Sequence, residues 1–366
     1  TIELTKNTNS KNFFSGIMSF QITVVPSQRS FSAVQDETIL AAAIRQGITL
    51  PYGCKDGVCG TCKCKMLSGT VVHGKHHENA LNTNEQAKGL ILTCCASAQS
   101  DIVLESRQVT LKSAFPIKRL PTRIQQLEKK SADVMLVHLQ LPASEVFEYH
   151  AGQYIELILK SGERRSYSMA NAPYHSALSK TLSLHIRHLP GGLFTDHVFS
   201  ELKEKDMYRI EGPFGSFYLR EETDKPIVLL ASGTGIAPIK AIIEQLQHIN
   251  SQRDVVLYWG GRRPSDLYLN DWITKQMAAM PSLRYVPVVS DALPEDNWTG
   301  RTGWVHHAVM ADFPNLSQHE VYACGAPVMV EAAHADLMAR CQLPADAFYA
   351  DAFITEAEKA KTGNPA

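Results

Sequence analysis

Residues 51–62 read Pro51-Tyr-Gly-Cys54-Lys-Asp-Gly-Val-Cys59-Gly-Thr-Cys62, and the segment Leu92-Thr-Cys94-Cys95 follows further along the chain. Three cysteines therefore lie in one short loop with the spacing C-x4-C-x2-C. Glycines stand between them, and a glycine can adopt positive φ, so the loop can turn its backbone N–H groups toward the sulfur atoms. The pattern indicates a metal centre rather than a set of disulfides.

The cysteine spacing is that of plant-type [2Fe–2S] clusters, which need four thiolates from one tight loop and one distant segment. We therefore predict that Cys54, Cys59, Cys62 and Cys94 bind such a cluster. A zinc site is the alternative hypothesis. Zinc sites usually join two short Cys-x2–4-Cys pairs, whereas the second segment here offers two adjacent cysteines.

Either Cys94 or Cys95 could supply the fourth thiolate. The segment resembles the end of the ferredoxin motif, whose leucine, cysteine and later aspartate correspond here to Leu92, Cys94 and Asp101. That register favours Cys94. Cys64 lies two residues beyond the last cysteine of the loop, roughly 6.8 Å along a strand, which is too far to replace it. We expect Cys64 and Cys95 to be core residues.

The whole chain has 366 residues, of which 44% are hydrophobic and 20% charged, and its net charge is −1. That length exceeds what one hydrophobic core usually holds, so we expect two or three domains. The near-neutral charge favours neither nucleic acid nor an anionic membrane as a partner. No apolar run approaches the roughly 20 residues of a membrane span, and the polar start does not resemble a signal peptide. We therefore expect a cytoplasmic protein.

Sequence texture divides the chain into three domains between two short tails. Residues 19–110 carry the cysteines between short strand-like runs. Residues 116–222 alternate apolar and polar side chains, which is typical of antiparallel strands. In residues 224–355 strands alternate with helices, as in a parallel α/β sheet. Residues 1–18 are expected to be a disordered extension, and residues 356–366 a tail. In the third domain we expect strands at 227–231, 255–259, 283–289 and 321–324 and helices at 238–248, 271–280 and 328–341.

The second domain contains three short motifs. They are Arg165-Ser166-Tyr167-Ser168, Gly191-Gly192-Leu-Phe-Thr195 and Glu211-Gly-Pro-Phe-Gly-Ser-Phe217. Arginine suits a bidentate clamp on a pyrophosphate, and tyrosine can lie against a flat ring. A glycine turn followed by threonine offers N–H groups and a hydroxyl to phosphate. Each motif alone could be an ordinary turn or strand end, but their order within one β domain indicates a flavin site.

The third domain opens with a buried strand and the turn Ser232-Gly233-Thr234-Gly235-Ile-Ala-Pro238. The glycines let the turn approach a dinucleotide's phosphates, and the start of the following helix attracts negative charge. Proline suits the first helical turn. The third glycine of the usual dinucleotide fingerprint is absent, so the turn could also be purely structural. Further on, Val321-Tyr-Ala-Cys324-Gly325 ends another strand, where Cys324 could be a small packed residue.

In this order the motifs are similar to those of the ferredoxin–NADP reductase superfamily. The resemblance implies a multidomain α+β and α/β protein. Its parts would be a β-grasp ferredoxin domain, a Greek-key β-barrel that binds FAD, and a Rossmann-like parallel α/β domain that binds NAD(P). The resemblance also places Arg165 at the FAD pyrophosphate, Tyr167 at the isoalloxazine ring and Ser168 near its N5 atom.

The same resemblance places Cys324 and Gly325 beside the nicotinamide and an aromatic residue over the flavin. The stretch Phe348-Tyr-Ala-Asp351-Ala-Phe353 resembles the closing signature of the superfamily. Either Tyr349 or Phe353 could cover the flavin. We take Phe353, with Ser168 and Cys324, as the catalytic candidates.

Most of residues 18–355 resemble the CDP-6-deoxy-Δ3,4-glucoseen reductases, in stretches such as RRSYSMANAP and ASGTGIAPIKA. That family implies an NAD(P)H-dependent reductase, in which hydride passes from NAD(P)H to FAD. Single electrons then leave through the [2Fe–2S] cluster to a dehydratase that acts on a sugar. Reductase components of aromatic and alkane oxygenases share this architecture, so an oxygenase component is the alternative acceptor. A redox-sensing binding protein is the alternative outside the enzymes.

Arg262 and Arg263 follow the strand expected at 255–259, at the position where a 2′-phosphate is recognised. Arginines there permit NADPH. The stretch WGGR also resembles NADH-using flavin reductases, so we expect NADH.

Three histidines, His73, His76 and His77, gather in one short loop. They could form a second metal site. No carboxylate or thiolate pattern accompanies them, which is more typical of a solvated loop.

Overall fold

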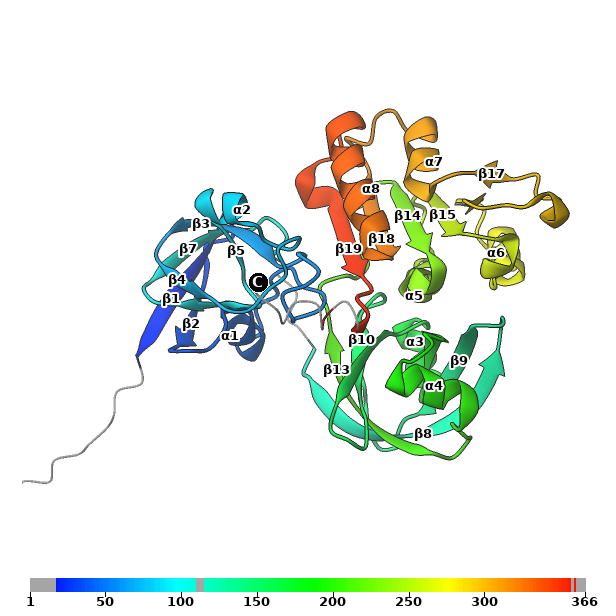
Figure 1. Cartoon of the computed structure of the whole chain (residues 1–366), viewed down its shortest axis with the longest axis horizontal. Coiled ribbons are helices and arrows are strands. Elements are labelled where there is room, and N and C mark those ends of the chain that lie inside the picture. Colours follow the sequence, from blue (N-terminus) through cyan, green and yellow to red (C-terminus); the bar gives the residue numbers. More distant parts are fainter. Residues whose placement is uncertain (1–17, 110–114, 357–358, 360–366) are drawn as a thin grey trace, which may run out of the picture.

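The computed structural model describes residues 18–109, 115–356 and 359. Three sheet-based bodies follow one another along the chain: an α+β domain, a β-barrel and a parallel α/β domain (Figure 1). The expected multidomain fold class is confirmed. The expected N-terminal extension, apart from Met18, and most of the expected tail lie outside the described residues. Among the residues that are described, no helix combines the length and apolar character that crossing a membrane requires.

The first domain is a five-stranded mixed sheet with one helix packed on it. The sheet order is β2-β1-β7-β3-β5, in which β1 and β7 run parallel and the other neighbours antiparallel. Alternate residues of a strand face opposite sides, and Ile22 and Val24 of β1 are fully buried against α1 and the rest of the core. The elements are β1 (Ser19–Val25), β2 (Arg29–Val34), α1 (Ile39–Arg45), β3 (Lys63–Ser68), α2 (Thr83–Ala87), β5 (Leu90–Leu92) and β7 (Ile102–Glu105), with the separate pair β4 (Val71–His73) and β6 (Ala96–Ala98).

The second domain is an antiparallel barrel with strand order β11-β10-β13-β8-β9-β12. A bridge between Met169 and Leu184, just beyond β11 and within β12, joins the two edges of the sheet. Closing the sheet removes edge strands that would otherwise be free to pair with other chains. Its elements are β8 (Lys118–Lys129), β9 (Val134–Gln140), β10 (Tyr154–Ile158), β11 (Arg164–Ser168), α3 (Pro173–Ser179), β12 (Thr181–Arg187), α4 (Leu193–Ser200) and β13 (Met207–Phe214).

The third domain is a parallel sheet of order β17-β16-β15-β14-β18-β19 with apolar cores on both faces. Its central strand β14 is buried on both sides, which explains its uninterrupted apolar sequence. The strands and helices expected from the sequence are all present, and α7, β17 and β19 are additional. The elements are β14 (Ile227–Ser232), α5 (Ile236–His248), β15 (Val255–Gly261), α6 (Asn270–Ala279), β16 (Leu283–Val289), β17 (Arg301–Thr302), α7 (Val305–Asp312), β18 (Glu320–Gly325), α8 (Pro327–Arg340) and β19 (Phe348–Ala352).

Hydrogen bonds hold the cysteine loop of the first domain against the barrel. The Tyr52 N–H donates to Ser216 Oγ at 2.8 Å, and Ser216 donates back to the Tyr52 carbonyl from its N–H at 3.2 Å and its hydroxyl at 3.0 Å. The Tyr154 hydroxyl on β10 donates to the Gly53 carbonyl at 2.8 Å. The loop that carries the cysteines therefore has a fixed place beside the barrel.

Candidate functional site

A cavity of about 1360 Å³ opens where the three domains meet. It is larger than the roughly 300–1,000 Å³ of a usual small-ligand pocket, so it has room for more than one such ligand. The cysteine loop, β11, the glycine turn before α4 and the turn after β14 all contribute to its wall. The predicted site residues on this wall are Cys54, Arg165, Ser166, Tyr167, Ser168, Gly191, Gly192, Thr195, Gly233, Thr234, Gly325 and Phe353.

The thiols of the cysteine loop and of the segment 92–95 lie close together, and Cys54 among them lines the cavity. Cys62 Sγ lies 3.1 Å from Cys94 Sγ. Cys54 Sγ accepts hydrogen bonds from the N–H groups of Asp56 and Cys59, both at 3.4 Å. The Cys59 thiol and these N–H groups lower the pKa of Cys54 to about 6. Converging thiols with backbone donors aimed at sulfur fit a [2Fe–2S] cluster, whose potential such donors tune.

Cys94 and Cys95 differ in their surroundings. Cys94 is buried against Cys62, whereas Cys95 is half-buried and has its Sγ 3.5 Å from Cys94 Sγ. A Cβ placed on Gly57, whose φ is +74°, would lie 2.6 Å from Cys95 Sγ. Cys95 therefore packs under the cysteine loop at the edge of the core, while Cys64 is a buried residue, as expected.

The strand β11 carries the predicted flavin residues into the cavity. Arg165 Nη2 contacts Glu163 Oε2 at 3.1 Å, which places the guanidinium on the cavity wall. The Tyr167 ring lies 5.9 Å from the Phe194 ring. Burial raises the pKa of Tyr167, so its hydroxyl stays protonated. An arginine and a flat ring on one wall fit the pyrophosphate and ring system of FAD.

The glycine turn before α4 has a geometry that only small residues allow. Gly191 has a φ of +82°, and a Cβ on Gly192 would lie 2.6 Å from Thr195 Oγ1. We predicted that the Thr195 hydroxyl contacts phosphate, but here it donates to the Leu189 carbonyl at 2.9 Å and so holds the turn. The first N–H groups of α4 have no partner within the helix, and they suit a phosphate.

The turn after β14 lies against the end of β18. Gly233 has a φ of +53°, and a Cβ on Gly235 would overlap the carbonyl oxygen of Cys324. Gly325 has a φ of +137° and lines the cavity. Gly235, Pro238 and Cys324, by contrast, lie behind the wall, and the side chain of Cys324 is fully buried. The close backbone approach at Gly233 and Gly325 fits a dinucleotide phosphate.

Asp351 on β19 lies between the flavin wall and the cysteine loop. The Ser168 hydroxyl donates to Asp351 Oδ2 at 3.4 Å. A Cβ on Gly53 would lie 3.4 Å from Asp351 Oδ1. Burial raises the pKa of Asp351 to about 7, although the bond from Ser168 opposes that shift. A carboxyl group that changes protonation near neutral pH thus lies beside both wall segments.

The two aromatic candidates near the C-terminus lie in different places. Phe353 lines the cavity, and its N–H donates to the Gly325 carbonyl at 2.8 Å. Tyr349 stacks on Tyr322 in the core of the third domain, with ring centroids 4.8 Å apart. The geometry therefore brings Phe353, rather than Tyr349, to the cavity.

Sequence reasoning did not single out Arg187, which ends β12 and lines the cavity. Its Nε lies 3.1 Å from Asp133 Oδ2, and a Cβ on Gly233 would lie 2.7 Å from its Nη1. The sequence pattern that could have identified Arg187 is an arginine at a strand end, four residues before a Gly-Gly turn. Arg187 therefore faces the turn on which a dinucleotide phosphate fits.

The three histidines at 73–77 bond locally. His76 Nδ1 lies 2.7 Å from the Gly74 carbonyl, and His77 Nδ1 accepts from the Asn79 N–H at 3.1 Å. The ring centroids of His73 and His76 are 6.0 Å apart. This arrangement is that of a surface loop rather than a metal site.

Three family models match the chain in succession. A 2Fe-2S iron-sulfur cluster binding domain matches residues 22–99. An oxidoreductase FAD-binding domain matches residues 121–218, and an oxidoreductase NAD-binding domain matches residues 229–335.

Relatives align with nearly their whole length to this chain. The chain is 42% identical over 341 residues to the CDP-6-deoxy-L-threo-D-glycero-4-hexulose-3-dehydrase reductase of Yersinia pseudotuberculosis, covering 92% of this chain and 99% of that protein. It belongs to the ferredoxin–NADP reductase-like family with a [2Fe–2S] domain. This reductase is also 36% identical to reductase component 1 of terephthalate 1,2-dioxygenase from a Comamonas species, covering 92% and 98%. Among solved structures, a cytochrome P450 reductase from Amycolatopsis is 33% identical with a TM-score of 0.73, covering 91% and 98%.

The reductase is therefore an NAD(P)H-dependent oxidoreductase with a [2Fe–2S] cluster, FAD and NAD(P)H as its cofactors. When bound, FAD would supply the acceptor for a hydride from NAD(P)H, and the cluster would supply one-electron transfer to an outside acceptor. The chain's own residues hold the groups close together and shape the cavity between them. Because the chain belongs to this reductase family, we reject the hypotheses of a zinc site at the cysteines and of a redox-sensing binding protein.

Proposed function

We propose that this reductase delivers electrons to a 3-dehydrase that acts on a CDP-linked 6-deoxy-4-hexulose. The observation that carries the proposal is the 42% identity across 99% of the Yersinia dehydrase reductase. Identity to the reductase component of terephthalate dioxygenase is lower, at 36% over a similar length. Because the fold and cofactors are common to both groups, they do not distinguish the acceptors.

An aromatic oxygenase component is the second candidate acceptor. It is favoured by the Comamonas relative and by the 0.73 TM-score of the Amycolatopsis cytochrome P450 reductase. Both candidates need a protein surface that accepts single electrons, so the reaction of the reductase is the same in either case.

Coupled assays separate these acceptors. The purified holoprotein is mixed with NADH and either the Yersinia 3-dehydrase and its CDP-sugar, or the oxygenase component and terephthalate under air. We expect sugar-dependent NADH oxidation at least about tenfold faster than terephthalate-dependent oxidation, a difference of roughly 1.4 kcal/mol in barrier. If terephthalate-dependent oxidation is faster by that factor, the proposal is wrong and the oxygenase component is the acceptor. Failure of both, with ferricyanide reduction intact, contradicts both.

For the cluster, we propose that Cys54, Cys59, Cys62 and Cys94 are the four ligands. The 3.1 Å approach of Cys62 and Cys94 and the two N–H bonds to Cys54 support this set. Cys95, half-buried beneath the loop, would then be a neighbour of the cluster rather than a ligand.

For FAD, we propose that Arg165 holds the pyrophosphate, Tyr167 lies against the isoalloxazine and Ser168 is close to its N5. Ser166 completes the strand, and the Gly191–Thr195 turn holds the phosphate at the start of α4. Phe353 covers the flavin, supported by its place on the cavity wall. Arg165→Ala should lose FAD during gel filtration, by about tenfold in retained flavin for one charge-assisted contact. Flavin occupancy equal to the wild type would contradict this role.

For the nicotinamide dinucleotide, we propose that Gly233, Thr234 and Gly325 contact it, while Gly235, Pro238 and Cys324 form the packed support behind them. We further propose a preference for NADH. Arg263 is held by Asp296 through bonds of 2.8 and 2.7 Å, so of the two arginines only Arg262, which lines the cavity, is left for a 2′-phosphate. The ratio of kcat/KM for NADH and NADPH measures this preference.

We also propose a cytoplasmic location, because every one of the eight cysteines is unpaired in the described structure, which is typical of a reducing compartment. The absence of a nucleic-acid partner stays a prediction.

A further inference from the structure

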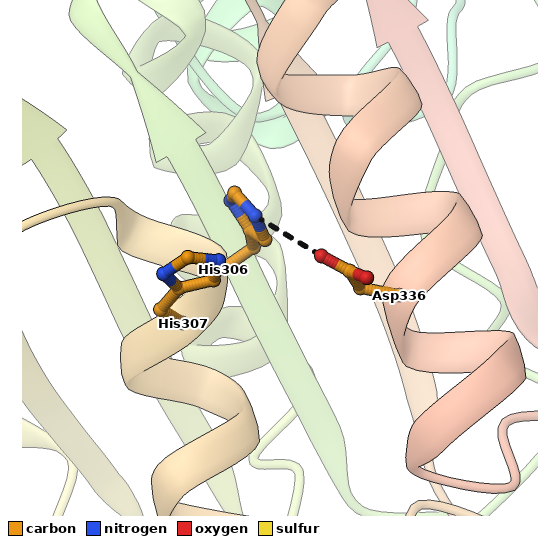
Figure 2. A group of neighbouring side chains, drawn as sticks. All are labelled: His306, His307 and Asp336. Carbon is orange, nitrogen blue, oxygen red and sulfur yellow. Dashed lines mark ion pairs between the residues drawn. The ribbon is translucent and has the colours of Figure 1, made fainter.

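Helices α7 and α8 lie next to each other on one face of the parallel sheet (Figure 1). His306 and His307 lie in the first turn of α7, and Asp336 lies on α8 (Figure 2). The ligand atoms of these three side chains all lie within 4.8 Å of one another. His306 Nε2 contacts Asp336 Oδ2 at 3.4 Å. No motif predicted this group, because its members are far apart in sequence and come from helices whose packing is set by the sheet.

The donor set suits a particular class of metal ion. Two imidazoles and one carboxylate are a common three-ligand set for zinc and neighbouring transition metals, with water in the fourth position. Donor atoms on one such ion lie roughly 3–4 Å apart, given metal–ligand bonds of about 2.0–2.2 Å. The observed spread needs only a modest rotation of the exposed His307 side chain.

The ring nitrogens of His306 lack good hydrogen-bond partners. Its side chain is 4% exposed, and its Nδ1 is buried without a hydrogen-bond partner among the described residues. The contact of its other nitrogen with Asp336 is long for a hydrogen bond. A metal ion bound between His306 Nε2 and the Asp336 carboxylate gives this buried ring a strong interaction in place of that long contact.

The neighbours of the group leave it accessible on one side. Asp336 Oδ1 contacts Arg340 Nε at 3.5 Å, but that arginine is largely exposed, and such pairs contribute little. The Trp304 ring covers His306 and His307, with centroids 5.9 and 5.4 Å away. Since His307 is exposed, an ion can reach the group from solvent.

We propose that His306, His307 and Asp336 form a binding site for a divalent transition-metal ion of the zinc class, which joins α7 to α8. The site is separate from the cysteine cluster, because none of its three side chains is among the proposed cluster ligands. Trp304, Val305 and His306 also line the large cavity. An ion at this site therefore fixes a wall segment of the dinucleotide side of that cavity.

Equilibrium dialysis of the intact holoprotein against Zn²⁺, with the metal measured by mass spectrometry, tests the proposal. Using holoprotein keeps the cluster cysteines occupied. We expect one Zn²⁺ per chain beyond the iron, and about tenfold or more weaker binding in His307→Ala and in Asp336→Asn. His76→Ala, in the separate histidine loop, is the matched control and should bind as the wild type does.

Two outcomes would overturn the site. One is wild-type holoprotein that binds no Zn²⁺ at micromolar concentrations. The other is a double variant, His307→Ala with Asp336→Asn, that binds as much Zn²⁺ as the wild type. The altered side chains are exposed or half-buried, and retained flavin content and an unchanged circular dichroism spectrum show that the variants fold.

Discussion

The identity of the fourth cluster ligand is decided at a single residue. Cys94→Ser should remove the cluster, because a serine hydroxyl is a far poorer ligand for iron than a thiolate. Cys95→Ser should retain it, since Cys95 packs beneath the loop and Cys94 faces Cys62. Visible absorbance and the EPR signal of the reduced protein measure the cluster. Loss in Cys95→Ser with retention in Cys94→Ser would reverse the assignment.

Sequence alone favoured Cys94 through its register with Leu92 and Asp101, and the structure adds a contact that supports it. The sequence left the partner of the Thr195 hydroxyl open. A threonine three residues after a glycine pair offers a hydroxyl to a phosphate or to its own turn with equal ease. Only the folded backbone, in which the Leu189 carbonyl lies 2.9 Å away, shows that the turn takes it.

His185 on β12 gives a pH dependence of stability. Burial holds its pKa well below the ordinary value of about 6.5. The folded protein therefore keeps His185 neutral while the unfolded chain becomes protonated below about pH 6.5. The contribution of His185 to the free energy of unfolding is therefore largest above about pH 6.5. It decreases as the pH falls, by at most about 1.4 kcal/mol per pH unit.

His185→Gln should remove this dependence while keeping a donor for the Tyr268 hydroxyl, which lies 3.0 Å from His185 Nδ1. The wild type should exceed the variant in thermal midpoint at pH 7.5, and the gap should narrow at pH 5.5. Other histidines are common to both proteins and cancel. A gap that stays constant between the two pH values would show that His185 titrates normally.

At the scale of elements, one ion-pair network joins strand β10 to the cysteine loop. Glu156 contacts Lys55 Nζ at 2.5 Å through one oxygen and Arg164 Nη1 at 2.7 Å through the other. Lys55 Nζ also lies 3.8 Å from the centroid of the Phe214 ring. Glu156 itself is buried, whereas the Lys55 and Arg164 side chains are 25% and 42% exposed. The buried carboxylate makes the network contribute more than a fully exposed pair would.

Glu156→Gln should destabilise the holoprotein by about 1–3 kcal/mol, because it removes charge-assisted bonds to two cations at once. Thermal unfolding, followed by loss of cluster absorbance, measures the effect. Glu128→Gln is the control, since Glu128 and Lys130 form an exposed pair at the surface, for which the expected loss is below about 1 kcal/mol. Equal losses in both variants would mean that the network does not hold the loop.

Elements differed in how well the sequence predicted them. The apolar run of β14 and the strong periodicity of α5 led to correct predictions, because local pattern determined them. Helix α7 was missed, since two histidines occupy its first turn and no side chain caps its start. Strand β19 was missed because its sequence, Phe348-Tyr-Ala-Asp351-Ala352, has no uninterrupted apolar run and places a carboxylate in a buried position.

At the scale of the whole molecule, the cavity could not be derived from any one motif. Its wall joins Cys54 of the first domain, Ser168 of the second and Phe353 of the third. The order of the motifs predicted the cofactors. The three segments are brought together by contacts such as the bond between Ser168 and Asp351. These contacts depend on packing between domains, and such packing leaves no local pattern in the sequence.

The bond from the Tyr154 hydroxyl to the Gly53 carbonyl crosses the boundary between the first two domains. Because Gly53 precedes the first cysteine of the loop, this bond fixes the loop relative to the flavin wall. Tyr154→Phe keeps the buried ring and its packing on Phe214 but removes the donor, leaving the Gly53 carbonyl without that bond. A typical cost is about 1–3 kcal/mol for the unsatisfied carbonyl.

We therefore expect Tyr154→Phe to slow NADH-dependent reduction of cytochrome c, which draws electrons from the exit end of the chain. Ferricyanide reduction, which would draw single electrons from reduced FAD without passing through the cluster, should be unchanged. Tyr208→Phe is the matched control, since the Tyr208 hydroxyl bonds to His197 within the barrel and touches neither the loop nor the cavity. If both activities fell together in Tyr154→Phe, the tyrosine would support the barrel itself, and the boundary bond would not be what sets the position of the cysteine loop.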